Sequence, residues 1–248
     1  MAFVFTVIAS FAFFVLTMTV SAMLVVVTLV DRRGRIWWPI INFWGWGSLR
    51  LVGIRRVHTQ GLDRLRGLQS AVVMANHDSY LDSPLLLGYV PEPIRAIAKR
   101  SLFYVPVFNL AMWGIGMIPI DRSNKKRALA SLNRAADQIR SGKVVLVFPE
   151  GTRSVGPELQ SFKKGGFMLA LQSGAPILPV GIAGTDVVLP PGWSALGKSA
   201  VGLVVGEPIP TRDLTLADRS TLMDTVHDAI QEQRRIARLL VTMEGPEQ

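Results

Sequence analysis

The hydrophobic pattern of the chain changes character near residue 53. Residues 2–30 form one apolar run without a charged side chain, and about 20 apolar residues are enough for a helix to cross a bilayer. A second apolar stretch, residues 37–52, is shorter and rich in Trp, which favours the headgroup level of a membrane. The pattern predicts a helical hairpin over residues 1–52 whose second arm is re-entrant or embedded at the interface. The alternative is that these Trp residues belong to a protein core.

Beyond residue 53, short apolar runs alternate with amphipathic segments. The runs predict strands and the segments between them predict helices. The expected strands cover residues 53–58, 70–75, 94–98, 116–120, 144–148, 177–182 and 201–205. The expected helices cover residues 107–113, 125–141 and 166–173. One further helix is expected to begin at residue 83, and a final helix is expected to run from about 215 to near 241. This alternation predicts an α/β fold, a mostly parallel sheet flanked by helices, behind a two-helix N-terminal anchor. Without an internal linker, residues 53–248 are expected to form one domain.

Charge narrows the range of partners. The formal net charge is +9 and the first thirty residues are uncharged, so all of it falls on residues 31–248. Such a body attracts lipid headgroups, phosphorylated substrates or nucleic acid. No nucleic-acid-reading motif is evident, which favours a phosphate or membrane partner over nucleic acid. The basic residues Arg32, Arg33 and Arg35 beside the apolar run predict a cell-membrane protein whose polar body stays on the cytoplasmic side. The absence of cysteine excludes thiol nucleophiles, Cys-ligated metals and disulfides.

The strand at 144–148 ends in the sequence Pro149-Glu150-Gly151-Thr152-Arg153-Ser154. Ligands of open α/β sheets bind beyond the carboxyl ends of such strands. Arg153 offers a planar fork of donors for phosphate or carboxylate, and Glu150 can orient that fork or accept from a substrate hydroxyl. Gly151 lets the backbone come close to a ligand. The alternative is a buried pair of Glu150 and Arg153 that fixes a turn.

A second polar segment, Asn76-His77-Asp78-Ser79-Tyr80-Leu81-Asp82, directly follows the strand at 70–75. A carboxylate at Asp82 could fix the tautomer of His77 and stabilise its charge. On a regular helix the two residues would lie about 140° apart, so pairing requires His77 on a loop and Asp82 in the first turn of the next element. A His–Asp pair without Ser or Cys favours a general base acting on a substrate hydroxyl. The alternative is a His that satisfies a turn.

One motif is rejected by its context. Gly192–Ser199 has the spacing G-x-x-x-x-G-K-S of a phosphate-binding loop. Such a loop follows a strand and opens a helix, whereas here two prolines precede and a strand-like run follows. We therefore do not expect nucleotide binding at this segment. The sequence also lacks a G-x-S-x-G elbow, which weakens a serine-hydrolase interpretation.

Together these residues carry a resemblance to a known family. The sequence resembles the membrane glycerolipid acyltransferases, specifically the bacterial 1-acyl-sn-glycerol-3-phosphate acyltransferases. The resemblance covers about Val72 to Pro179 and consists of four blocks in the family's order. The blocks are Asn76-His77-x-x-x-x-Asp82, Gly116–Arg122, Phe148–Ser154 and Ala175–Val180. Four ordered blocks are far more specific than any one of them.

The resemblance implies a set of roles. His77 would be the catalytic base and Asp82 its partner. The residues implied in binding the acceptor's phosphate and glycerol are Arg122, Glu150, Gly151, Thr152 and Arg153, with Lys99 and Lys163 as further phosphate contacts. It also implies that residues 53–248 are the acyltransferase domain and that acyl-CoA or acyl carrier protein donates the acyl group. Lysophosphatidic acid would be the acceptor and phosphatidic acid the product. No cofactor and no metal are expected.

Three hypotheses follow from the sequence. The first is acyl transfer to the sn-2 hydroxyl of 1-acyl-glycerol-3-phosphate without an acyl-enzyme. The second keeps this chemistry and changes the acceptor to glycerol-3-phosphate, lyso-ornithine lipid or another lysophospholipid. The third belongs to a different class, a membrane-anchored lipid-binding protein without turnover. The His77–Asp82 pair counts against the third.

Overall fold

A computed structural model describes residues 2–154, 156, 158–189 and 200–243 of the chain. The helices are α1 (Ala2–Val30), α2 (Trp37–Leu51), α3 (Asp82–Tyr89), α4 (Phe108–Gly114), α5 (Lys125–Arg140), α6 (Lys164–Ser173), α7 (Thr185–Val188) and α8 (Arg219–Thr242). The strands are β1 (Val57–Gln60), β2 (Ala71–Ala75), β3 (Ile94–Lys99), β4 (Ile118–Ile120), β5 (Val144–Val147), β6 (Ile177–Ala183) and β7 (Val201–Val205). Two short 3-10 helices, η1 (Leu62–Leu65) and η2 (Arg100–Tyr104), complete these elements.

The strands form one seven-stranded sheet in the order β1-β7-β6-β2-β5-β3-β4. The five strands from β6 to β4 run parallel, and β7 pairs antiparallel with β6. Every residue of β2, β5, β6 and β7 is buried, as expected of strands covered on both faces. The mostly parallel sheet predicted from the sequence is therefore confirmed, and β1 is the edge strand that the pattern indicated.

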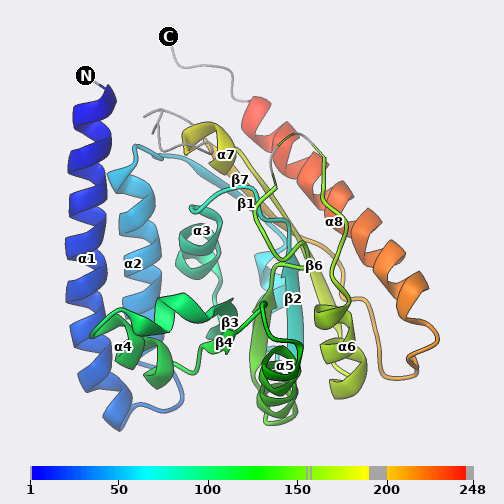
Figure 1. Cartoon of the computed structure of the whole chain (residues 1–248). Coiled ribbons are helices and arrows are strands. Elements are labelled where there is room, and N and C mark those ends of the chain that lie inside the picture. Colours follow the sequence, from blue (N-terminus) through cyan, green and yellow to red (C-terminus); the bar gives the residue numbers. More distant parts are fainter. Residues whose placement is uncertain (1, 155, 157, 190–199, 244–248) are drawn as a thin grey trace.

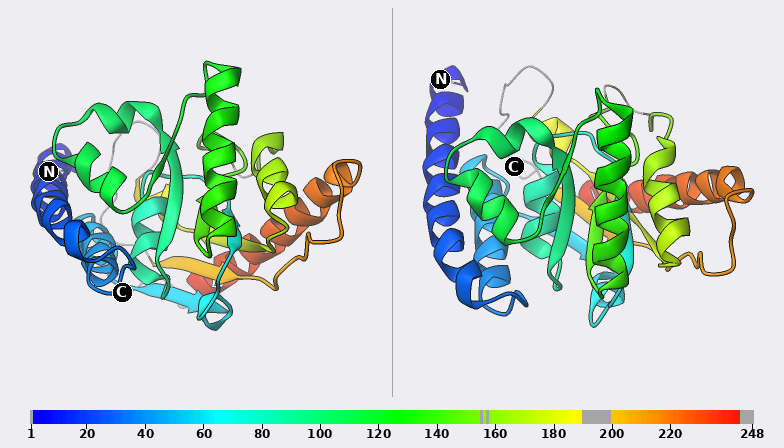
Figure 2. Two further views of the ribbon diagram at one scale, coloured as in Figure 1. Left: turned by 90° about the horizontal axis from the view of Figure 1, so that it is seen from below. Right: turned by 60° about the horizontal axis from the view of Figure 1, so that its bottom comes forward.

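Helices cover both faces of the sheet, as Figure 1 shows. Alternate residues of β2 point to opposite faces, with Val73 in a core shared with α1 to α4 and Val72 in a core shared with α5, α6 and α8. In both views of Figure 2, α1 and α8 lie at opposite ends of the molecule. The result is a three-layer arrangement in which the carboxyl ends of the parallel strands share one edge.

The first helix has the properties predicted for a membrane anchor. Within α1, Val4–Val30 has a mean hydropathy of 2.5, and by length and composition this segment can cross a membrane. Large apolar side chains are exposed along it, among them Ile8, Phe11 and Leu29. Because most of this apolar surface is not covered by protein, α1 is suited to contact lipid.

The second helix forms where it was expected, but the environment predicted for its first Trp residues is wrong. Trp37 and Trp38 are only 1% and 4% exposed, and the indole N–H of Trp38 donates to the carbonyl of Val90. The backbones of α2 and α3 touch, since a Cβ placed at Gly45 would lie 2.5 Å from the amide nitrogen of Gly88. The start of α2 therefore belongs to the protein core, the alternative that the composition left open.

A single carboxylate organises the turn between α1 and α2. Asp31 accepts hydrogen bonds from the backbone N–H groups of Arg33, Gly34, Ile36 and Trp37. Burial alone would raise the pKa of Asp31, but these four hydrogen bonds outweigh it and lower the pKa to about 2. The boundary between an anchor at 1–52 and a domain at 53–248 stays a prediction.

Several boundaries differ from those expected. The last helix begins at Arg219 rather than near residue 215, because Thr215 and Asp218 bond to each other in a turn that precedes it. The sequence pattern did not indicate α7, η1 and η2, which are only four or five residues long. The segment Gly192–Ser199 lies outside the described residues.

Candidate active site

Loops from three neighbouring strands meet at one edge of the sheet. The chain leaves β2 at Ala75, β5 at Val147 and β6 at Ala183. Both β5 and β6 pair with β2 in parallel, so these three carboxyl ends lie side by side. The polar residues that follow the strands therefore converge, as the sequence pattern predicted for the first two.

His77 and Asp82 form a hydrogen-bonded pair at this edge. The distance from His77 Nδ1 to Asp82 Oδ2 is 2.8 Å, and the side chains are 19% and 0% exposed. His77 lies on the loop after β2, and Asp82 is the first residue of α3. The placement that pairing required is thus confirmed. Because Nδ1 is engaged, Nε2 is the ring nitrogen left for a substrate.

Both carboxylate oxygens of Asp82 are hydrogen-bonded to the protein. Its Oδ2 also accepts from the backbone N–H groups of Asp78 and Ser79, at 2.7 and 2.8 Å. Its Oδ1 accepts from the hydroxyl of Thr185, at 2.6 Å. These donors fix the direction of the carboxylate towards His77. The His77 ring also stacks on Phe148, with ring centroids 4.1 Å apart.

Glu150 joins the loop after β5 to the loop after β2. It is 0% exposed, and its Oε1 accepts from the backbone N–H of His77 at 2.8 Å. Its Oε2 accepts from the hydroxyl of Ser154 and from the backbone N–H of Gln160. The backbone N–H of Ser154 in turn donates to the carbonyl of His77. Both carboxylate oxygens therefore bond to the protein, and Glu150 fixes the position of His77.

Arg153 lies over an aromatic ring rather than beside Glu150. Its guanidinium carbon is 3.4 Å from the ring centroid of Tyr80, on the loop after β2. Among the described residues, no ion pair joins Arg153 to Glu150. Arg153 is half-buried, with its guanidinium against this ring.

The other predicted binding residues lie along the same edge. Gly151 has a φ of +77°, which favours glycine, and a Cβ placed there would lie 3.2 Å from Cγ of Lys163. Thr152 and Lys163 are exposed. Lys99 ends β3, and Arg122 follows β4. These strands lie two and three positions from β2 in the sheet, which separates them from β2 by about 10 and 14 Å at the usual strand spacing. The structure thus groups Gly151, Arg153 and Lys163 near the pair and leaves Lys99 and Arg122 further along.

Sequence analysis assigned no role to several residues that support the pair. They are Asn76, Asp78, Ser154, Thr185 and Arg234. Thr185 follows the carboxyl end of a buried strand, the signal that identified the other two segments, so it could have been found. Asp78 and Arg234 pair across 156 residues of sequence, and no local pattern indicates such a contact.

Electrostatics set Asp78 apart from ordinary carboxyls. Burial raises its pKa from 3.8 to about 6, the charges of Asp82 and Glu150 act in the same direction, and Arg234 opposes them.

Among the described residues, no cluster of three or more His, Asp or Glu side chains could hold a metal ion.

Three comparisons relate this arrangement to known proteins. The family model described as Acyltransferase matches residues 56–183. The human 1-acyl-sn-glycerol-3-phosphate acyltransferase beta is 32% identical over 224 residues, which cover 87% of this chain and 78% of that protein. A Salmonella typhimurium 1-acyl-sn-glycerol-3-phosphate acyltransferase is 29% identical over 172 residues, 68% of either chain.

A crystal structure of the 1-acyl-sn-glycerophosphate acyltransferase PlsC from Thermotoga maritima superposes with a TM-score of 0.82 at 25% identity. The match covers 100% of this chain and 98% of that one. The chain spans about half the length of the chloroplastic relatives from Brassica napus and Arabidopsis thaliana, 48% and 46% respectively.

Proposed function

Because this chain belongs to the Acyltransferase family, we propose that it transfers a fatty acyl group to the sn-2 hydroxyl of 1-acyl-glycerol-3-phosphate, giving phosphatidic acid. The observation that carries the proposal is the His77–Asp82 pair at the carboxyl edge of the sheet, 2.8 Å apart. The four-block resemblance and the names of the relatives support the same reaction. The acyl donor is a thioester, either acyl-CoA or acyl carrier protein.

The chemistry needs one base. Nε2 of His77 takes the proton of the acceptor hydroxyl while the hydroxyl oxygen attacks the thioester carbonyl. The tetrahedral intermediate then collapses, the carbon–sulfur bond breaks, and the imidazolium returns the proton to the leaving thiolate. Asp82 stabilises the imidazolium and holds the tautomer that presents Nε2. No covalent acyl-enzyme forms, since the acceptor attacks the thioester directly.

Binding of the acceptor is assigned to the basic residues at the same edge. Arg153, Arg122, Lys99 and Lys163 are cations beside the carboxyl ends of β5, β4 and β3 and the start of α6. A guanidinium fork matches a phosphate, and we assign the closest contact to Arg153 because it lies between the loops after β2 and β5. Thr152 and the backbone at Gly151 complete this binding edge, whereas Glu150 acts on His77, whose backbone N–H it accepts from.

The membrane supplies the acceptor in this proposal. Next to α1, the surface of η2 and α4 exposes Leu102, Tyr104, Leu110 and Trp113. An apolar surface beside a lipid-facing helix is suited to sit at the bilayer interface. We infer that the enzyme works at the inner membrane with its basic body on the cytoplasmic side, where anionic headgroups attract Lys and Arg. A reporter fused after Gln248 that proved extracytoplasmic would contradict this orientation.

The test is thiol release by the full-length protein in detergent micelles or vesicles. Acyl-CoA and acyl carrier protein are offered as donors, and the acceptors are 1-acyl-glycerol-3-phosphate, glycerol-3-phosphate, lyso-ornithine lipid and other lysophospholipids. We expect the highest kcat/KM with 1-acyl-glycerol-3-phosphate. A preference for another acceptor would keep the chemistry and change the substrate, whereas lipid binding without thiol release would indicate a non-catalytic protein.

A further inference from the structure

A buried ion pair beside the active site has no part in the chemistry described above. Nη2 of Arg234 lies 2.8 Å from Oδ2 of Asp78, and the side chains are 5% and 4% exposed. Removing two charges from water is costly, and a buried ion pair is weak support for stability when compared with apolar residues of similar size. The pair therefore calls for an explanation other than stability.

Asp78 belongs to the loop that carries the catalytic pair. Its backbone N–H donates to Oδ2 of Asp82, while its carboxylate accepts from Nδ2 of Asn76 and from Arg234. The side chain of Asn76 also bonds to both backbone groups of Ile182 in β6. The loop is thus held from two directions, and Asp78 takes part in both.

Arg234 comes from an element whose position is closely defined. The backbone of α8 lies against the sheet at two glycines, because a Cβ placed at Gly181 would be 2.1 Å from the amide nitrogen of Arg234. At Gly202 it would be 2.6 Å from the carbonyl oxygen of Ala237. The backbone at Arg234 therefore has little room to shift relative to the strands that carry the active-site loops.

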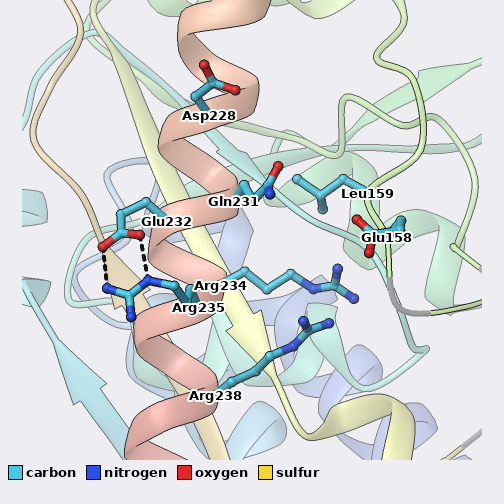
Figure 3. A pocket seen from close by; sticks show the side chains of 8 residues that line it. All are labelled: Glu158, Leu159, Asp228, Gln231, Glu232, Arg234, Arg235 and Arg238. Carbon is cyan, nitrogen blue, oxygen red and sulfur yellow. Dashed lines mark hydrogen bonds and ion pairs between the residues drawn. The ribbon is translucent and has the colours of Figure 1, made fainter.

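Neighbouring arginines on α8 serve different sides of the helix. Figure 3 shows Arg234 extending from α8 towards the segment at Glu158 and Leu159, whereas Arg235 points to the other side and pairs with Glu232. Arg235 is largely exposed, with 60% of its side-chain surface accessible. Arg235 therefore provides a matched control for Arg234.

The charges around Asp78 explain what Arg234 contributes. The charged groups that face Asp78 are Arg234 from α8, Asp82 from α3 and Glu150 from the loop after β5. Two of these three are carboxylates, and burial also favours the protonated form of Asp78. The guanidinium of Arg234 is the charged group that favours the ionised form of Asp78. In that form the Asp78 carboxylate can accept from Asn76 and Arg234 together.

We propose that Arg234 is a positioning residue for the catalytic pair: through Asp78 it fixes the loop that carries His77 and compensates the charge of a third carboxylate next to the pair. The proposal rests on the acyl transfer proposed above. Arg234 acts on the orientation of His77 and Asp82 and does not touch the substrate. Its loss should therefore lower kcat and alter the pH profile while leaving acceptor binding intact.

The experiment compares full-length Arg234→Met, Arg234→Lys, Arg235→Met and the double variant Asp78→Asn/Arg234→Met. Thiol release is measured against pH with 1-acyl-glycerol-3-phosphate, and rates are normalised to the folded fraction from near-ultraviolet circular dichroism. We expect Arg234→Met to lower kcat by about 10-fold or more with KM for the acceptor changed less than about 3-fold. Arg235→Met should match the wild type.

The pH profile separates positioning from a merely structural role. Without Arg234, the charge of an ionised Asp78 is no longer compensated and favours the imidazolium of His77. This effect moves the acid limb of the kcat profile to higher pH. The double variant removes both charges, so its acid limb should return towards the wild-type position and its kcat should exceed that of Arg234→Met.

Distinct outcomes overturn the proposal. If Arg234→Met keeps the wild-type kcat per folded molecule and an unchanged acid limb, Arg234 serves only the fold and the inference fails. If Arg234→Met does not fold, the double variant decides. A kcat per folded molecule below the wild type supports positioning, whereas a kcat equal to the wild type would show that the buried pair is dispensable for positioning. Absence of thiol release by the wild type would instead contradict the proposed function.

Discussion

The active edge of the sheet contains two regions that differ in how their polar atoms are used. In the buried centre, Asp82 and Glu150 are 0% exposed, and all of their carboxylate oxygens accept hydrogen bonds from the protein. At the rim, Lys99, Thr152 and Lys163 are exposed and Arg153 is half-buried. The contacts of the centre hold the loop of His77 and its ring in one orientation, whereas the cationic side chains of the rim are accessible from solvent.

This difference assigns separate kinetic effects to the two regions. Changes in the centre should alter kcat, because preorganised groups act on the reacting atoms. Changes at the rim should alter KM for the phosphorylated acceptor, because they remove binding energy. Glu150 tests the division, since its sequence context suggests the rim and its contacts place it in the centre.

The largest effect is expected from His77→Ala. Loss of a general base typically costs about 10²–10⁴-fold in rate, and His77 contributes little to the core because it lies on a loop. The variant should keep its circular dichroism spectrum and its KM for the acceptor while kcat falls by this factor. A variant that retained near-wild-type kcat would remove His77 from the mechanism.

A smaller effect, in the other kinetic parameter, is expected from Arg153→Ala. It removes a charge-assisted fork to phosphate worth roughly 1.5–3 kcal/mol, so KM for 1-acyl-glycerol-3-phosphate should rise about 10- to 150-fold. KM for the acyl donor should change little. Arg140→Ala is the matched control, since Arg140 is exposed and pairs with Asp137 at the end of α5. Equal effects on donor and acceptor would show that Arg153 is not an acceptor contact.

Glu150→Gln should lower stability and kcat without raising KM for the acceptor. An amide in place of the carboxylate presents N–H groups to donors such as the backbone N–H of His77, and one buried unmet bond costs about 1–3 kcal/mol. The melting temperature should fall by several degrees, about 2–4 °C for each kcal/mol in a chain of this size. Glu158→Gln, on the exposed part of the same loop, should leave both quantities unchanged. A rise in KM for the acceptor without a fall in kcat would show that Glu150 belongs to the rim.

The smallest effect is expected outside both regions, at Asp31. Its pKa of about 2 lies below the ordinary 3.8, so its stabilising effect is complete above about pH 4 and is lost as pH falls towards 2. Asp31→Asn should lower the melting temperature at pH 7 by about 2–4 °C. The gap to the wild type should close between about pH 4 and pH 2 without a change in kcat per folded molecule. A gap independent of pH would contradict the role of the ionised carboxylate.

The fold was largely readable from the sequence because its signals are local. Fully buried strands read as unbroken apolar runs, and the pairing of His77 with Asp82 depends on a five-residue separation across a loop and a helix start. The environment of Trp37 and Trp38 was not readable, because a protein core and a membrane interface favour the same aromatic residues. The contacts of Asp82 with Thr185 and of Asp78 with Arg234 join distant segments, so only the folded arrangement reveals them.

The most direct test of the division between centre and rim is how each variant changes the preference for the phosphorylated acceptor, measured as the ratio of two kcat/KM values. For full-length wild type, Asp82→Asn and Arg153→Ala, kcat/KM is measured with 1-acyl-glycerol-3-phosphate and with 1-acylglycerol, which lacks the phosphate. Arg153→Ala should reduce the preference for the phosphorylated acceptor about 10-fold or more. Asp82→Asn should lower both values by the same factor and leave the preference unchanged. A preference lost in Asp82→Asn and kept in Arg153→Ala would contradict the account.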